Sequence, residues 1–438
     1  LFPQSNIVGF TATADQTTRL DILNKIFNNE AKTFVKGFDR PNLYLSIIQK
    51  NNAKRQLLDF LNSRKEQSGI IYCLSRKRTE EISSFLNQSG FKTSAYHAGL
   101  DANVRKNVQD TFMTEENHIV IATIAFGMGI DKPDIRFVVH LNIPSSMEAY
   151  YQEIGRAGRD GNPADTLLIY GIDDVIVRRK MIEENNYNDE FKLKENKRLD
   201  YLVSYCETPE CRRKVLLAYF DENSHQCNHC DNCNNPPTLI DGTLHAQKML
   251  ATIYKTGQFF GQAHIINVLR GSEDKKILDR GHNLLSVHGI GKDQPREFWK
   301  FFFGQLLTFG HVIVNFQKYM TVQITKTGME ILKEKRNFKY KIFPKKQHSK
   351  RDYKIPNKTI QTDLSPDLEL LKSLKTLRLE FAKKQNLPAF TVFHDTTLIQ
   401  MSSKKPMNEE QFLSLDGVGP AKLKKYGESF LNLIKNFH

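Results

Sequence analysis

The hydrophobic positions of residues 68–173 fall in short, nearly continuous apolar runs, separated by stretches with helical periodicity. Strands that are apolar on both faces and alternate with helices are typical of a parallel sheet covered on both sides. The pattern therefore predicts one α/β lobe. Its expected strands are 69–74, 93–96, 119–123, 136–141 and 166–170.

The pattern changes after this lobe. Residues 187–219 read as helices, and they lead into a stretch rich in cysteine and asparagine. Amphipathic helices follow, and then two strand-like runs, 311–315 and 319–324, predict a two-stranded hairpin. Lysine and arginine dominate residues 333–358, which is typical of a solvated linker, although direct phosphate contact is the alternative. From Ser365 to the end we expect helices throughout.

Charge and composition indicate which kind of partner the protein binds. The 438 residues include 63 lysine and arginine residues against 49 acidic ones, and this net charge of +14 indicates a polyanionic partner. Hydrophobic residues make up 39% of the chain, which excludes intrinsic disorder for most of it. The longest apolar run, 119–130, is shorter than the ~20 residues that cross a bilayer, and no basic-then-apolar leader opens the chain. We therefore expect a soluble, cytoplasmic protein with no membrane partner.

Four cysteines have the spacing of a metal centre. Two residues separate Cys227 from Cys230 and Cys230 from Cys233, and Cys211 supplies a fourth thiol after a helical stretch. Two-residue spacing lets neighbouring thiolates close around one soft cation, and four thiolates complete a tetrahedron. The sequence therefore predicts a structural zinc site. An iron–sulfur cluster or disulfides are the alternatives, and a neighbouring histidine could replace one thiolate.

Residues 150–161 carry the most informative motif. If they form one helix, Gln152, Arg156 and Arg159 project from one face, because Arg156 and Arg159 each point within about 40° of Gln152 at 100° per residue. Two interior glycines cost roughly 1 kcal/mol each against alanine, which indicates close approach by a ligand or another backbone. Two arginines that keep their charge suit a triphosphate, whose charge must be stabilised during transfer. An exposed arginine pair held in salt bridges is the alternative.

A glycine loop follows the apolar run 119–123. Gly127 and Gly129 permit close approach to the phosphate of a nucleotide or a nucleic acid. Ligands of open α/β sheets bind at the carboxyl ends of the strands, which is where this loop begins. One strand and one connection separate the loop from the arginine motif, so we expect the two to form one site.

Residues 365–438 offer a second set of candidate contacts. Phe390 lies in an aromatic loop, and a glycine turn at 417–419 leads into a helix that carries Lys422 and Lys424. Exposed amides and lysines suit a sequence-independent grip on phosphates, and an exposed aromatic ring can stack on a base. Packing in the core is the alternative interpretation of Phe390.

These motifs resemble the RecQ family of superfamily 2 DNA helicases, and the resemblance covers nearly the whole chain. Six segments carry it. They are Thr11–Ala14 (helicase motif III), Phe38–Leu43 (the interlobe signature), Tyr72–Arg76 (motif IV), Tyr96–Leu100 (the turn that follows in the family), Ala122–Asp131 (motif V) and Gln152–Gly161 (motif VI).

The resemblance implies a fold and an activity. The fold is α/β, with a RecA-like parallel-sheet helicase lobe 2 followed by a helical zinc-binding subdomain, a winged helix and an all-α HRDC domain. The activity is ATP-dependent unwinding of DNA with 3′-to-5′ polarity, in repair and recombination. The expected boundaries are 1–45 for the end of lobe 1 and the interlobe segment, 46–180 for lobe 2, 181–237 for the zinc subdomain, 238–335 for the winged helix, 336–364 for a basic linker and 365–438 for the HRDC domain.

The resemblance also implies roles for single residues. Arg159 matches the arginine finger of motif VI, Arg156 its companion on the ATP phosphates, and Gln152 belongs to the same catalytic motif. The other residues expected to contact ATP, which binds with Mg²⁺, are Gly127, Gly129 and Asp131. The residues expected to contact DNA are Ser75, Arg76, Thr123, Phe390, Lys422 and Lys424.

Two motifs of a complete motor are absent from the 438 residues. The sequence contains neither G-x-x-x-x-G-K-[ST] nor a DExH acid box. The first residue is Leu, and residues 7–14 read as a strand entering a loop, so we expect a first lobe upstream and no ATP hydrolysis by this piece alone. A non-catalytic zinc and winged-helix DNA-binding protein with a degenerate helicase lobe is the alternative.

The expected partners follow from these assignments. They are single-stranded and duplex DNA, ATP and, through the winged helix, a single-strand-binding protein. Within the cytoplasm, the expected location is the bacterial nucleoid.

Overall fold

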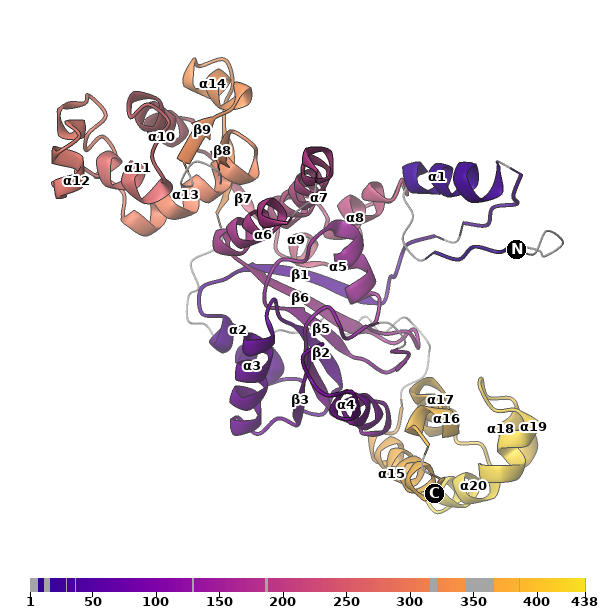
Figure 1. Ribbon diagram of the computed structural model, residues 1–438. Helices are drawn as coiled ribbons and strands as arrows, with labels where there is room; N and C mark the ends of the chain where they lie inside the picture. The colour runs from indigo at the N-terminus through magenta and orange to yellow at the C-terminus, as the bar shows by residue number, and fades with distance from the viewer. Residues whose placement is uncertain are drawn as a thin grey trace. The chain divides into compact units, whose positions relative to one another are not determined.

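The computed structural model is drawn in Figure 1, and it forms two compact units. One contains residues 1–143, 148–171 and 350–438, and the other contains 144–147 and 172–349. Most of the predicted motif III, Gly129 and most of the predicted basic linker lie outside the described residues. The structure describes residues 7–11, 16–28, 30–35, 37–127, 130–185, 188–315, 321–342, 366–385 and 387–437.

A parallel sheet forms the centre of the first unit, as the apolar runs predicted, but it has six strands rather than five because β1 was not predicted. Its order is β1-β6-β5-β2-β4-β3, and every neighbouring pair is parallel. All residues of β2, β4 and β5 are buried, which explains why their sequences are almost continuously apolar, with His140 of β5 as the exception. The strands are β1 (Leu43–Gln49), β2 (Gly69–Tyr72), β3 (Thr93–Tyr96), β4 (Ile119–Ala122), β5 (Phe137–His140) and β6 (Ala164–Tyr170).

Helices cover both faces of this sheet (Figure 1). Residues of α2 (Ala53–Leu61) and α3 (Arg76–Gln88) share one apolar cluster with Ile71 and Val139. On the other face, the ring of Phe112 in α4 (Ala102–Thr114) meets Phe126 edge-on, with the ring centroids 5.5 Å apart. A further helix, α5 (Met147–Ile154), connects β5 to β6, and α1 (Gln16–Phe27) precedes the sheet.

The second unit begins with helices and continues as a winged helix. Trp299 is fully buried in the core of the winged helix, and its indole N–H donates to the carbonyl of Gly291 at 2.8 Å. The predicted hairpin is confirmed as β8 (Val312–Asn315) paired antiparallel with β9 (Thr321–Ile324). The other elements are α6 (Ile172–Glu184), α7 (Asp189–Glu207), α8 (Arg212–Tyr219), α9 (Asp231–Asn234), β7 (Thr238–Asp241), α10 (Thr243–Lys255), α11 (Gln262–Leu269), α12 (Lys275–Leu278), η1 (His282–Leu284), α13 (Arg296–Thr308), α14 (Lys326–Leu332) and β10 (Lys339–Ile342).

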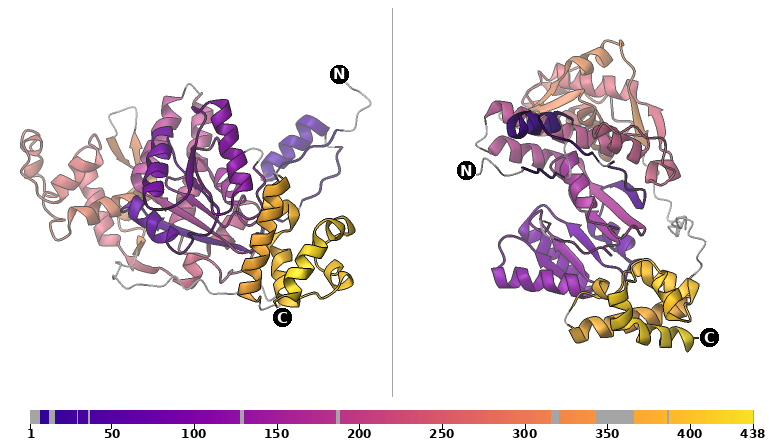
Figure 2. Two further views of the ribbon diagram at one scale, coloured as in Figure 1. Left: turned by 90° about the horizontal axis from the view of Figure 1, so that it is seen from below. Right: turned by 90° about the vertical axis from the view of Figure 1, so that its right-hand side faces the viewer.

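The last part of the chain is all helical, as predicted, and Figure 2 shows it in orange to yellow. Phe393 and Tyr426 are among the buried residues of its own apolar core. No described helix of the chain combines the length and the apolar character that a membrane crossing demands. The helices are α15 (Leu368–Gln385), α16 (Ala389–Val392), α17 (Asp395–Lys404), α18 (Glu409–Leu413), α19 (Pro420–Lys422), η2 (Leu423–Gly427) and α20 (Glu428–Lys435).

Candidate functional site

The arginine motif lies partly on a helix and partly on a turn. Helix α5 ends at Ile154, and the next residues form consecutive turns, so the prediction of one helix through Arg159 is wrong. Two glycines of these turns adopt the left-handed region, with φ of 56° at Gly158 and 81° at Gly161. Such backbone breaks a helix, and glycine adopts it without steric cost. Arg156 and Arg159 therefore project from a turn rather than from a helix face.

Both arginines nevertheless reach the glycine loop after β4. The Arg156 guanidinium donates to the carbonyl of Gly127, and a Cβ at that position would collide with the guanidinium. Arg159 Nη1 donates to the carbonyl of Ile130 at 2.9 Å and to Asp131 Oδ1 at 2.5 Å. The loop and the arginines thus meet at the carboxyl end of β4, as expected of one site. The salt-bridge alternative is also realised at Arg159.

A buried network underneath fixes this meeting point. His140 Nε2 lies 2.7 Å from Glu153 Oε2, and both residues are buried. The His140 ring stacks on Tyr72, whose hydroxyl donates to the carbonyl of Phe126 at 3.0 Å. Burial raises the pKa of Tyr72, which keeps the phenol a neutral donor. The network ties α5 to the start of the glycine loop. Sequence reasoning missed it, although a histidine ending an apolar run was a signal.

Three predicted DNA contacts lie at the same edge of the sheet. Ser75 is exposed and caps α3, where its hydroxyl accepts from the Arg78 amide at 3.3 Å. Arg76 is exposed at the first position of that helix. Thr123 is half-buried directly after β4, and its amide donates to the Tyr96 carbonyl at 3.1 Å. Because β2 and β4 are parallel neighbours, these residues share the carboxyl edge with the glycine loop.

The other predicted DNA contacts lie in the C-terminal helices. Phe390 is half-buried in α16, and its ring stacks on His394 with centroids 6.2 Å apart. Lys422 holds its ammonium 5.3 Å from the centroid of the buried Phe393 ring, and burial lowers its pKa. Lys424 is exposed in η2. Of these three residues, Lys424 is therefore the one most open to a phosphate.

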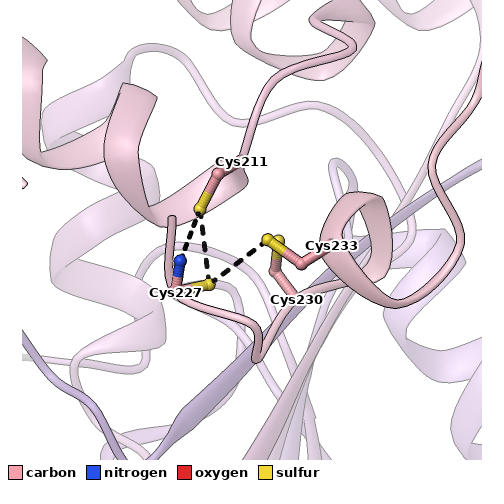
Figure 3. A group of neighbouring side chains, drawn as sticks. All are labelled: Cys211, Cys227, Cys230 and Cys233. Atoms are coloured by element: carbon pink, nitrogen blue, oxygen red, sulfur yellow. Dashed lines mark hydrogen bonds between the residues drawn. The ribbon is translucent and has the colours of Figure 1, made fainter. Parts of the chain in front are cut away.

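The four predicted zinc ligands come together (Figure 3). The sulfur atoms of Cys211, Cys227, Cys230 and Cys233 all lie within 4.8 Å of one another. The amide of Cys227 donates to the Cys211 sulfur and the amide of His229 to the Cys227 sulfur, both at 3.3 Å. All six cysteines of the chain are described and free, so the disulfide alternative is wrong. A donor set of four soft thiols fits Zn²⁺ in a closed, structural site.

Side chains next to the cysteines hold the segment around Cys211 against the segment that carries Cys230 and Cys233. Arg212 has no exposed surface, and its Nε donates to Asp231 Oδ1 at 2.9 Å. Its Nη1 also donates to the carbonyls of Tyr205 at 2.6 Å and Cys206 at 3.0 Å. The Asn232 amide group donates to two carbonyls of the turn before Cys211. Because Asp231 and Asn232 lie between two ligands, these bonds hold the cysteines in register.

Comparison with protein families divides the same chain into four consecutive matches. The helicase conserved C-terminal domain matches residues 50–161, which include the glycine loop and the arginine turn. The RecQ zinc-binding family matches residues 172–234, which include all four cysteines, and this supports zinc over an iron–sulfur cluster. The RQC domain matches residues 236–350 and the HRDC domain residues 367–434.

Whole-chain relatives agree with these matches. The chain is 39% identical to an ATP-dependent DNA helicase RecQ of Haemophilus influenzae, over 99% of the chain and 70% of the relative. It is 34% identical to the protein of the same name from Bacillus subtilis, over 98% of the chain and 70% of the relative. The modules of the structure follow the same order along the chain as the family matches. They are the α/β lobe, the zinc cysteines, the winged helix and the C-terminal helices. The chain therefore belongs to the RecQ helicase family.

Proposed function

We propose that this protein hydrolyses ATP at the carboxyl edge of the parallel sheet and uses the energy to move 3′ to 5′ along DNA and to separate its strands. The convergence of Arg156 and Arg159 on the loop after β4 carries the proposal. Two guanidinium groups at one sheet edge can stabilise charge on a phosphoryl group during transfer. The activity of the curated relatives supports the same interpretation.

The proposed nucleotide contacts are the residues predicted from the sequence. Arg159 acts as the arginine finger and Arg156 binds the phosphates beside it, while Gln152 is exposed on the last turn of α5. Gly127 and Asp131 face the same arginines. ATP would bind with Mg²⁺, which neutralises phosphate charge. The 438 residues contain no G-x-x-x-x-G-K-[ST]. We therefore infer that these residues by themselves bind DNA but need another lobe to hydrolyse ATP.

The proposed duplex contact is the winged helix. A winged helix docks on duplex DNA through a helix and its wing, and exposed basic residues bind the phosphates. A single-strand-binding protein is our candidate partner for the same module, and the bacterial nucleoid our proposed location. Five exposed basic residues of this region are the proposed phosphate contacts, and they are Arg270, Lys275, Lys276, Arg280 and Lys292.

The test is ATP turnover by the full-length protein with and without DNA. Arg159→Ala should abolish turnover and leave DNA binding near the wild-type value, because the arginine acts on the phosphates. Arg55→Ala, which removes an exposed arginine of α2, is the matched control and should keep both properties. Wild-type turnover by the Arg159→Ala variant would reject the assignment. A full-length wild type that binds DNA and never hydrolyses ATP would favour the non-catalytic alternative.

A further inference from the structure

The segment before β1 grips the arginine turn. The Arg40 guanidinium donates to the carbonyls of Gly155 at 3.3 Å, Ala157 at 2.8 Å and Gly158 at 2.8 Å. The Asn42 side-chain amide donates to the carbonyls of Gly158 and Asn162, both at 2.8 Å. All five bonds therefore end on main-chain carbonyls of the turn that carries Arg156 and Arg159.

These carbonyls lie beyond the end of α5, where the backbone makes no regular helical bonds. The Gly158 carbonyl also accepts from the Gly161 amide at 3.1 Å, so the turn is held by its own backbone as well as by Arg40 and Asn42. One planar guanidinium can bind several oxygen atoms at once in a fixed geometry, and its charge strengthens each bond. Arg40 is half-buried, so water competes for the same carbonyls less than it would at an exposed side chain. The shape of the turn consequently depends on Arg40.

Asn42 and Phe38 hold the same motif at two further points. Gly158 has φ of 56°, and a Cβ there would clash with the Asn42 amide. The contact with Asn42 therefore needs glycine at position 158. On the other side, the Tyr151 hydroxyl donates to the Phe38 carbonyl at 2.8 Å, and the two rings meet edge-on at 5.7 Å. The segment thus contacts both α5 before Arg156 and the turn after it.

The far end of this segment is anchored in the sheet. The Asn42 carbonyl accepts from the Ala164 amide at 3.0 Å, and Leu43 starts the parallel pairing of β1 with β6. A movement of the chain before Phe38 cannot be absorbed by sliding β1, because a register shift would break a whole ladder of bonds. It acts instead on the residues that the segment grips, which are those of the arginine turn.

We propose that Arg40 and Asn42 are positioning residues for ATP hydrolysis, which set the place of Arg159 and pass motion of the preceding chain to it. This inference rests on the proposed function and adds a coupling element to the same site. Neither residue touches the nucleotide. Each acts through the turn, so its loss should lower the rate of the chemical step more than the affinity for ATP.

The decisive measurement is steady-state, DNA-stimulated ATP hydrolysis by full-length Arg40→Ala protein. We expect kcat to fall about 10- to 100-fold, since displacement of a catalytic group by about 1 Å has effects of that size. KM for ATP should stay within about threefold of wild type, because the ligand contacts remain. Arg40→Lys should recover only part of kcat, since one ammonium cannot bind three carbonyls.

A matched control separates positioning from general stability. Arg64 is a buried arginine at the opposite end of the strands, before β2, where it binds the Phe60 carbonyl and Asp165. Arg64→Ala should lower thermal stability and leave kcat of the folded protein unchanged. If Arg40→Ala does not fold, Tyr151→Phe removes the hydroxyl that donates to the Phe38 carbonyl and keeps the ring. It should lower kcat about threefold, a smaller effect of the same kind.

The outcomes distinguish this inference from the function beneath it. A wild type that hydrolyses ATP, with Arg40→Ala or Tyr151→Phe variants that keep wild-type kcat, overturns the positioning role alone. An equal loss of kcat in Arg64→Ala would also overturn it, because the effect would then be general. A wild type that never hydrolyses ATP rejects the proposed function and the inference together.

Discussion

Two arginine–aspartate pairs stand at the two chemical centres of this chain, and they differ in burial. Arg212 and Asp231 lock the cysteine cluster, with side chains that are 0% and 21% exposed. Arg159 and Asp131 meet at the sheet edge, where their side chains are 34% and 82% exposed. A buried pair is costly to break because one charge is left without a partner. An exposed pair exchanges partners easily.

The difference separates a closed centre from an open one. Around the zinc cysteines the hydrogen-bond partners of Arg212 belong to the same subdomain, so releasing Arg212 would leave buried groups without partners. At the sheet edge Arg159 is exposed enough to exchange Asp131 for a phosphate at little cost, which its proposed catalytic role requires. The zinc cluster and the proposed nucleotide site thus differ in how firmly their arginines are held.

Zinc removal should disturb the protein more than any single substitution at the sheet edge. Metal analysis of purified protein should give one zinc per chain and no visible absorption band. Chelation, or Cys230→Ser, should unfold residues 172–234 because binding free energy at such sites is folding free energy. Limited proteolysis can follow this unfolding. Iron with a visible band, or a chelator-treated protein with unchanged protease resistance, would contradict the zinc assignment.

Arg212→Ala should have the second-largest effect on stability. Loss of the buried guanidinium leaves Asp231 and two carbonyls without their partner and should lower the free energy of unfolding by about 3 kcal/mol. Lys214→Ala is the control two residues along the same helix, because its pair with Glu210 is exposed on both sides. Its effect should stay below about 0.5 kcal/mol by urea denaturation. Equal effects of the two variants would remove the contrast between buried and exposed pairs.

Gly158→Ala tests the turn that carries Arg156 and Arg159, the proposed catalytic arginines. An alanine at φ of 56° is strained, and its Cβ would meet the Asn42 amide, so stability should fall by about 1–3 kcal/mol. DNA-stimulated ATP turnover should fall as well, since the turn must shift. Gly161→Ala also has a positive φ but open space around it, and it should cost less in both assays. A larger effect at Gly161 would indicate that strain alone matters.

Asp131→Asn should have the smallest effect on stability. The pair with Arg159 is largely exposed, so the free energy of unfolding should change by less than about 1 kcal/mol. Urea denaturation of the variant measures it. A loss above about 2 kcal/mol would show that this pair is structural, like the one at the zinc centre.

The sheet and the zinc centre were both predictable from local sequence. The strands of the sheet interior are buried and, apart from His140, consist of apolar residues, glycine and tyrosine, and the zinc ligands are spaced by the geometry of one cation. β1 was missed because its residues alternate between buried and half-buried, and the boundary expected between residues 45 and 46 falls inside it. A half-buried strand has no continuous apolar run to reveal it.

The arginine turn shows where local sequence stops being informative. The spacing of Gln152, Arg156 and Arg159 fits a helix, and nothing nearby in the sequence reports the left-handed backbone at Gly158. The contacts of Arg40 with the turn join residues 115 to 118 positions apart. Only the folded sheet brings such residues together, so a single sequence does not predict them.

The most direct test of the proposed motor is strand separation by the full-length protein on two duplexes that differ in the polarity of their single-stranded tail. We predict ATP-dependent unwinding of the duplex with a 3′ tail, little unwinding with a 5′ tail, and none by Arg159→Ala protein that still binds both. Tight binding of both duplexes by the wild type, with no ATP-dependent separation of either, would contradict the proposal.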